Sequence, residues 1–266
     1  MSFSYATVLE TVPLSLRMVR VVLEVEDLDS LDVKTAGDSA VGVYLSESDV
    51  GRNYSVRSQD GTRISLDVVL HERGPGTTWA QGARAGDRVG LDHARSWYQP
   101  PADTDWQLLI TDLSGLPACA RIIEELPVDQ RAIALVEVAS EDDLAYLPGH
   151  PNLTLVTSVG TGNGHAPSVL AASTRDLKLP SGVGYCWFAG EAAESRTVRK
   201  YVRGLGWKAD QFDITGYWRF DSETWDAKFA LVADDMVAVY EKALADGKGD
   251  KVASEEFDDA LERVGL

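Results

Sequence analysis

The sequence predicts a small antiparallel β domain over residues 1–100, followed by an α/β domain over residues 101–266. Three observations lead to this prediction. Short runs rich in β-branched residues recur about every ten residues in the first hundred. A polar segment with a proline pair, residues 99–105, then interrupts the pattern. From Trp106 onward, apolar strand-like runs alternate with helix-like segments, which is typical of a parallel sheet covered by helices.

In the first domain we expect strands at residues 19–25, 41–45, 52–57 and 63–72, and a turn leading into a further strand at residues 86–92. The clearest pattern is that of residues 63–72. There Ile64, Leu66, Val68 and Leu70 fall on every second position, so they share one face of the strand. Short antiparallel strands at this spacing form either a barrel or a sandwich.

In the second domain we expect strands at residues 105–113, 131–139, 152–159, 183–191 and 211–218, and helices at residues 116–126, 166–173 and 192–206. Two more helices are predicted at residues 223–244 and 255–264. The first of them has apolar residues at core-like spacings, namely Trp225, Phe229, Leu231, Met236, Val239 and Tyr240. These helices could cap the sheet or pair two chains. We favour the cap and therefore expect a monomer.

The composition excludes several classes of protein. The formal charge is −17, and such an acidic chain repels nucleic acid and anionic membrane surfaces, so neither is expected as a partner. The two cysteines, Cys119 and Cys186, make no disulfide framework. The N-terminus lacks the pattern of a signal peptide, and no run approaches the roughly 18 apolar residues of a membrane span. We expect a cytoplasmic protein.

Residues 51–57 are the first candidate ligand site. On a strand, Arg52 and Tyr54 share one face, while Ser55 and Arg57 share the other. A flavin needs a flat surface beside its ring, hydroxyls at its polar edge and cations at its diphosphate, which Tyr54, Ser55 and Arg52 could supply. Arg57 points to the opposite face unless a β-bulge turns it. The alternative is an ordinary exposed strand.

Residues 71–83 are the second candidate. The segment holds three glycines and a proline, of which Gly74, Pro75 and Gly76 indicate a tight turn that opens a helix, and the free N–H groups at a helix start favour a phosphate. Thr77 could cap this helix, and the Thr78 hydroxyl could donate to the same anion. A capped surface helix is the alternative.

Two further candidates follow strands of the α/β domain, at residues 111–118 and 187–203, where ligands of open α/β sheets bind. In the second, Glu191 could accept a hydrogen bond from a ribose or a carboxamide. The alternatives are an ordinary strand-to-helix turn and a solvated basic helix face. Residues 157–167 are rich in glycine but lack the lysine of a phosphate-binding loop, so we interpret them as a mobile loop.

The order and spacing of these motifs over residues 17–220 resemble the siderophore-interacting protein family of FAD-dependent ferric-siderophore reductases. The resemblance rests on the runs RNYSVR, DVVLHERGPGTTWA, DWQLLITDLSGLPACARIIEELP, WFAGEAAESRTVRKYV and GYWRF. It implies a ferredoxin-reductase-like fold, with an antiparallel β-barrel for FAD and a Rossmann-like α/β domain for NADPH or NADH. The substrate would be a ferric siderophore, whose iron is released as Fe(II).

The resemblance also implies site residues. Those near FAD would be Arg52, Tyr54, Ser55, Arg57, Val69, His71, Gly76, Thr77, Thr78, Trp79 and Ala80. Those of the nicotinamide cleft would be Asp112, Ser114, Pro117, Gly190 and Glu191. No protein acid, base or resident metal is implied, because the flavin performs the redox chemistry. Lys34, Lys208, Arg219 and Lys228 are candidates for an anionic-siderophore pocket.

The sequence departs from the family pattern at two informative places. Asp112 is followed by Leu113, Ser114 and Gly115, where the family has a Glu-Thr-Ala run. The arginine usual after the third α/β strand, which would pair with the 2′-phosphate of NADPH, is absent. NADH or a ferredoxin therefore stays open as the donor. The rival functions are a flavin reductase or electron-transfer protein with another acceptor, and a non-catalytic ligand-binding module.

Overall fold

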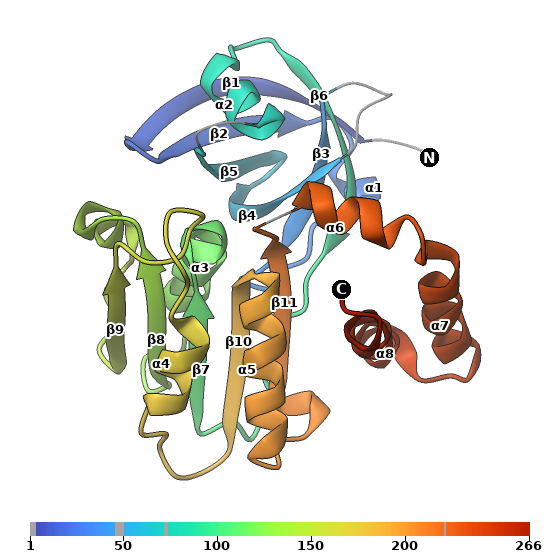
Figure 1. Ribbon diagram of the computed structural model, residues 1–266. Helices are drawn as coiled ribbons and strands as arrows, with labels where there is room; N and C mark the ends of the chain where they lie inside the picture. The colour runs from blue at the N-terminus through green and yellow to red at the C-terminus, as the bar shows by residue number, and fades with distance from the viewer. Residues whose placement is uncertain (1–3, 46–50, 72–73, 221) are drawn as a thin grey trace. The chain divides into compact units, whose positions relative to one another are not determined.

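The first hundred residues form a closed antiparallel barrel (Figure 1). The structure is a computed structural model that describes residues 4–45, 51–71, 74–220 and 222–266. Neighbouring strands follow the order β1-β2-β5-β4-β3-β6. The strands are β1 (Ser4–Ser15), β2 (Met18–Val25), β3 (Ala40–Tyr44), β4 (Arg52–Asp60), β5 (Arg63–Val69) and β6 (Arg88–Arg95). Of the two architectures that the sequence left open, the barrel is the one observed.

The alternation predicted for residues 63–72 is confirmed within the described part of that run. Ile64, Leu66 and Val68 are buried in the barrel core, whereas Leu70 is only partly buried against it. Residue 72 lies outside the described residues. Sequence patterning did not predict β1, which pairs with both β2 and β6 and so closes the barrel. Its inward residues include small ones such as Ser4 and Ala6, which give a weak hydrophobic period.

Two short helices complete the barrel. Helix α1 (Leu28–Leu31) follows β2, and helix α2 (Pro75–Gly82) connects β5 to β6. Ala80 of α2 is buried in the barrel core, and Trp79 packs against it. The helix is therefore fixed onto the barrel by its apolar face.

Residues 106–218 form a five-stranded sheet in the order β11-β10-β7-β8-β9. The strands are β7 (Trp106–Thr111), β8 (Arg131–Val138), β9 (Leu153–Val159), β10 (Gly184–Glu191) and β11 (Phe212–Trp218). Strands β10, β7, β8 and β9 are parallel to their neighbours. The chain moves outward from β7 to β9 and then returns to β10 beside β7. This reversal is the topological switch point at which such sheets bind ligands.

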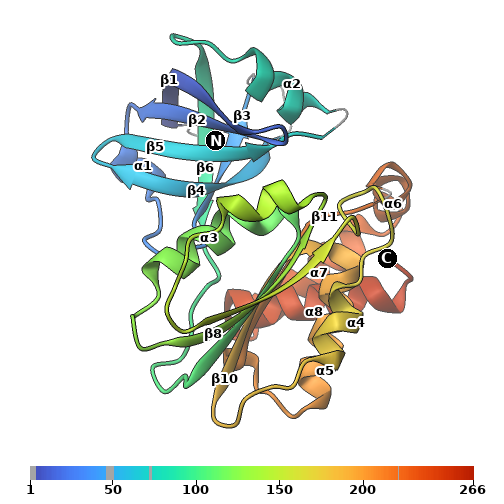
Figure 2. The ribbon, with the colours of Figure 1, turned by 90° about the vertical axis from the view of Figure 1, so that its left-hand side faces the viewer.

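Helices cover both faces of this sheet (Figure 2). Helix α3 (Leu116–Glu125) packs on one face through Ile122 and Ile123. Helices α4 (Leu170–Asp176) and α5 (Ala192–Gly204) pack on the other, where Leu170 and Val198 join the core. Three short 3-10 helices lie between these elements, η1 (Leu113–Gly115), η2 (Glu141–Tyr146) and η3 (Ala209–Gln211).

One prediction and one alternative interpretation for the α/β region need correction. The helix expected at residues 166–173 begins only at Leu170, because Pro167 and its neighbours belong to a hydrogen-bonded loop. The basic run of α5 is not a purely solvated face. Arg199 is buried and its guanidinium donates to the Ile214 carbonyl at 2.6 Å, which joins α5 to β11.

Residues Trp218–Leu266 form a separate compact unit, whose described residues include the helices α6 (Ser222–Phe229), α7 (Ala233–Ala245) and α8 (Gly249–Arg263). Its core gathers Met236, Ala260 and Leu261, with the stacked rings of Trp225 and Phe229 against it. The single helix expected over residues 223–244 is wrong, since it ends at Phe229 and restarts at Ala233. Leu231 falls in this break and is exposed.

Candidate functional site

The start of β4 packs closely against the start of α2. We call Arg52, Tyr54 and Gly76, which meet there, the cradle. A Cβ added at Gly76 would collide with the Tyr54 hydroxyl and would come within 3.7 Å of the Arg52 side chain. The Tyr54 ring lies 5.8 Å from the Trp79 ring at an angle of 44°. Burial raises the pKa of Tyr54, and Arg52 lowers it in part. The residues predicted from two separate motifs, 51–57 and 71–83, are thus brought together.

The start of α2 differs from the prediction in its capping. The N-cap is Gly74, with φ of 134°, and it makes no side-chain capping bond. Thr77 therefore does not cap the helix, because its hydroxyl accepts from the His71 N–H at 3.0 Å. The Thr78 hydroxyl donates to the Gly74 carbonyl at 3.1 Å. Residues 72 and 73 of this predicted loop lie outside the described residues.

The cradle has the features that a flavin dinucleotide requires. The first N–H groups of a helix have no partner within it. Pro75 lacks one, so the first in α2 is that of Gly76, a residue beside the Arg52 side chain, and an anion there would meet both. The indole N–H of Trp79 is buried without a hydrogen-bond partner in the structure. A buried donor left unpaired is costly, and a bound acceptor would satisfy it. The residues present therefore fit a flavin and its diphosphate.

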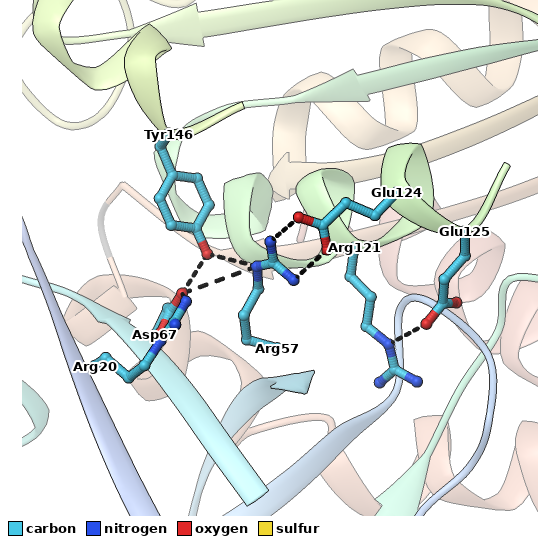
Figure 3. Close-up of polar contacts among 7 residues, drawn as sticks. All are labelled: Arg20, Arg57, Asp67, Arg121, Glu124, Glu125 and Tyr146. Carbon is cyan, nitrogen blue, oxygen red and sulfur yellow. Dashed lines mark hydrogen bonds and ion pairs between the residues drawn. The ribbon is translucent and has the colours of Figure 1, made fainter. Parts of the chain in front are cut away.

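A β-bulge in β4 decides where Arg57 points. The pairing of β4 with β5 shifts between Val56 and Ser58, so Arg57 is the extra residue. Its guanidinium makes two hydrogen bonds, of 2.6 and 2.5 Å, to the Glu124 carboxylate of α3, and it donates to the Tyr146 hydroxyl at 3.1 Å (Figure 3). Through these contacts Arg57, for which the resemblance implies a place near the flavin, joins the barrel to the α/β region.

The same contact continues to a buried carboxylate on β5. Asp67 accepts from Arg20 of β2 at 2.7 and 2.8 Å and from the Tyr146 hydroxyl (Figure 3). We call the set Arg20, Arg57, Asp67, Glu124 and Tyr146 the polar clamp. Sequence reasoning missed Tyr146 and Glu124, because nothing local marks a residue whose partner is 79 or 67 positions away.

A second buried carboxylate, Asp38, fixes the segment that leads out of the barrel. It accepts from the backbone N–H groups of Trp97 and Tyr98, at 3.0 and 2.9 Å, and from the indole N–H of Trp187 on β10, at 3.3 Å. Burial raises the pKa of Asp38, and these hydrogen bonds lower it in part. Asp38 therefore orders the connection between the barrel and the sheet.

Tyr217, at the end of β11, brings a buried hydroxyl toward Ser55 of β4. That hydroxyl has no hydrogen-bond partner of ordinary geometry. Burial raises the pKa of Tyr217, the nearby Asp38 carboxylate raises it further, and the approach of the Ser55 hydroxyl lowers it in part. The sequence showed Tyr217 only as part of a strand, so its place beside Ser55 is new information.

The two predicted strand-to-helix turns of the α/β domain meet at the switch point between β7 and β10. Asp112 accepts from the Ser114 N–H at 2.8 Å and from the Glu191 N–H at 3.0 Å, so it ties the turns together. The Glu191 carboxylate caps α5 by accepting from the Ala193 N–H at 2.5 Å. At Gly190 a Cβ would lie 3.0 Å from Asp112, which shows how closely the turns approach.

The remaining predicted site residues are dispersed. Pro117 is buried in the first turn of α3, and Val69 packs against the core of the α/β region. The pKa of His71 is lowered, first because protein atoms displace water from its imidazole and second because His165 lies near. Among the pocket candidates, Lys34 pairs with Asp32. Arg219 lies over the Trp225 ring within the C-terminal unit.

Two family models match the chain. A model described as siderophore-interacting protein matches residues 104–221, and one described as siderophore-interacting FAD-binding domain matches residues 45–95. The boundary between them falls in the segment that follows β6.

Curated relatives match over part of their length. An uncharacterized protein of Mycobacterium tuberculosis is 34% identical over 63% of this chain and 64% of its own. The ferric vibriobactin reductase of Vibrio cholerae is 27% identical over 60% and 61%. The NADPH-dependent ferric-chelate reductase of Escherichia coli is 28% identical over 58% and 60%. The matches thus span less than two thirds of these relatives.

Solved structures share the fold. A siderophore-interacting protein from Acinetobacter baumannii superposes with a TM-score of 0.77, at 21% identity, over 90% of this chain and all of that one. A ferredoxin NADP+ reductase from Neisseria gonorrhoeae, solved with FAD and NADP, gives 0.62 at 17% identity over 82% of this chain and all of that one. The fold is therefore ferredoxin-reductase-like. None of the helices in the described ranges has the length and apolar character needed to cross a membrane.

Proposed function

Because the chain belongs to the siderophore-interacting protein family, we propose that it is an FAD-dependent oxidoreductase that reduces ferric siderophores with electrons from NAD(P)H. The observation that carries this proposal is the cradle formed by Arg52, Tyr54 and Gly76. It offers an aromatic ring, a cation and a helix start within one small region. The names of the Vibrio and Escherichia relatives, both ferric reductases, support the reaction class.

The cradle residues would hold FAD by distinct interactions. Tyr54 would pack its ring against the isoalloxazine, and Ser55 would hydrogen-bond its polar edge. Arg52 and the first turn of α2 would neutralise the diphosphate. Bound FAD would supply chemistry that protein side chains lack, namely hydride acceptance and single-electron transfer. The protein contributes position and the exclusion of water.

The turns at the switch point would receive the nicotinamide. In open α/β sheets this crevice binds dinucleotides. The Asp112 side chain, 1% exposed, is engaged with both turns, so its role is to position Ser114, Gly190 and Glu191. Gly190 leaves space beside Asp112, because a Cβ at this position would lie only 3.0 Å from the Asp112 carboxylate.

The chemistry of iron explains why reduction of a ferric siderophore would release its metal. Siderophores bind Fe(III) through hard oxygen ligands, and Fe(II) fits such ligands less well, so reduction releases the metal. No acid or base of the protein is needed at the iron. We propose that the reaction takes place in the cytoplasm, and a reduced ferredoxin is the alternative donor.

The test begins with the visible spectrum of the purified protein. We expect flavin bands that bleach when a reduced nicotinamide is added without oxygen and return when a ferric siderophore follows. The Fe(II) released would be measured with a chelator that becomes coloured when it binds Fe(II). A protein that stays colourless after soaking in FAD would leave only the non-catalytic ligand-binding module as a function.

Two glycines of α2 provide a matched pair of variants. Gly76→Ala forces the new methyl into Tyr54, and overpacking costs about 1–3 kcal/mol, so FAD should bind roughly tenfold more weakly or worse. Gly82→Ala, in the same helix, meets no atom within 4 Å and should leave FAD binding unchanged. Equal FAD affinities for the two variants, measured by flavin fluorescence, would place the flavin elsewhere.

A further inference from the structure

The sheet edge beyond the switch point decides which nicotinamide the site accepts. NADPH differs from NADH by a 2′-phosphate on the adenosine ribose. Dinucleotide folds accept that phosphate with an arginine, or bind the free 2′-hydroxyl with an acid about 20 residues after the first strand-to-helix turn. In this chain that turn ends at Gly115, so the decisive region is the carboxyl edge of β8 and β9.

This edge has acids and lacks strong cations. Residues 132–174, all of them described, contain no lysine or arginine. The same stretch carries Glu137 near the end of β8 and Glu141, Asp142 and Asp143 in the first turn of η2. Arg17 reaches this region from the barrel, but it lies 3.7 Å from Asp143 and donates to Ser140, so its charge is already compensated.

Glu137 is the acid closest to the place where the fold carries its ribose-binding carboxylate. Its side chain is 0% exposed. One carboxylate oxygen accepts from the Thr161 hydroxyl and the Val169 N–H, both at 2.8 Å, whereas the other has no hydrogen-bond partner. A Cβ at Gly162 would collide with that second oxygen. The backbone after β9 therefore lies directly over a carboxylate that the protein leaves partly unpaired.

The loop after β9 offers little to a phosphate. The N–H groups of Gly160, Gly162 and His165 donate to carbonyls of β8 and of the loop itself. Asn163, with φ of 57°, accepts from the Leu113 N–H at 2.9 Å and so binds the loop to the first turn. The segment that the sequence suggested to be a mobile loop is thus hydrogen-bonded in place, with several of its donors already used.

We propose that this chain uses NADH in preference to NADPH, because the edge of β8 and β9 repels a 2′-phosphate. The inference rests on the proposed function and makes it more specific. Glu137, Glu141 and Asp142 set the potential, because Asp143 is paired with Arg17 and residues 132–174 contain no lysine or arginine. A ribose with a free 2′-hydroxyl carries no charge there and meets no such penalty.

Val159 provides the test variant. It is the last residue of β9 and is 41% exposed, so a long polar side chain fits there without loss of core packing. Val159→Arg adds the missing guanidinium, and Val159→Gln adds length and polarity without charge. We expect the wild-type kcat/KM to favour NADH by about tenfold or more, with a smaller ratio at high salt. Val159→Arg should raise kcat/KM for NADPH alone, whereas Val159→Gln should leave the ratio unchanged.

Calorimetric titration with NAD+ and NADP+ gives a readout independent of turnover. NAD+ should bind more tightly to the wild-type protein, and Val159→Arg should tighten NADP+ alone. Equal or better use of NADPH by the wild-type protein would overturn the inference and leave the proposed function intact. The inference also fails, with the function intact, if both Val159 variants behave alike. Flavin that neither nucleotide reduces would instead overturn the proposed function, and the inference with it.

Discussion

The polar clamp yields a prediction whose magnitude comes from burial. Asp67→Ala removes a carboxylate whose side chain is 0% exposed and which accepts from Arg20 through two nitrogens. Breaking a buried ion pair by deleting one partner costs about 3–5 kcal/mol, since the other charge stays uncompensated. Arg20 is 31% exposed and can recruit water, so we expect a loss near the lower end of that range, about 3 kcal/mol.

The assay is urea unfolding, followed by tryptophan fluorescence and by circular dichroism. Glu24→Ala is the matched control, because Glu24 pairs with Arg63 across the same two strands, β2 and β5, but at an exposed position. Exposed pairs contribute little, so this variant should unfold at nearly the wild-type midpoint. Similar midpoints for Asp67→Ala and Glu24→Ala would refute the argument from burial.

A double-mutant cycle tests whether the clamp acts as one unit. Tyr146→Phe removes only the hydroxyl between Asp67 and Arg57, and a hydrogen bond to a charged group is worth about 1.5–3 kcal/mol. Added to Asp67→Ala, the Tyr146 change should cost clearly less than it does alone, since its acceptor is already gone. Full additivity would mean that Tyr146 and Asp67 stabilise the protein independently.

Three further predictions concern other groups of the fold. The pKa of His71 is lower in the folded protein than its usual 6.5, so as the pH falls the unfolded chain takes up this proton first. His71 therefore contributes stability above pH 6.5 that is lost as the pH falls through its folded pKa. His165→Asn should raise the His71 pKa in an NMR titration, and an unchanged pKa would contradict the proximity of the two histidines. Cys119 and Cys186 are buried with raised thiol pKa values, so a thiol reagent should label neither in the native protein and both in guanidinium; rapid native labelling would contradict their burial. Tyr217→Phe removes an unpaired buried hydroxyl and should leave stability unchanged or improved in the FAD-free protein; a clear loss in a thermal melt would show that Tyr217 has a partner.

The sequence predicted the elements whose pattern is local. The period of two in β5, the apolar runs of β7 and β10 and the helix of residues 116–126 all appear within a few residues of their expected bounds. Each is encoded by spacing that can be read within one segment. The candidate site was also proposed from the sequence, because Tyr54, Gly76 and Asp112 lie in short motifs with their own turn chemistry.

The tertiary structure decided what those residues do. Arg57 points to α3 because a bulge in β4 turns it, and a bulge leaves no mark in the hydrophobic period. Tyr217 approaches Ser55, and Glu137 is covered by Gly162, only because distant segments pack together. Sequence periodicity reports which face of an element is buried. It does not report which distant element packs against that face, and the candidate site depends on such packing.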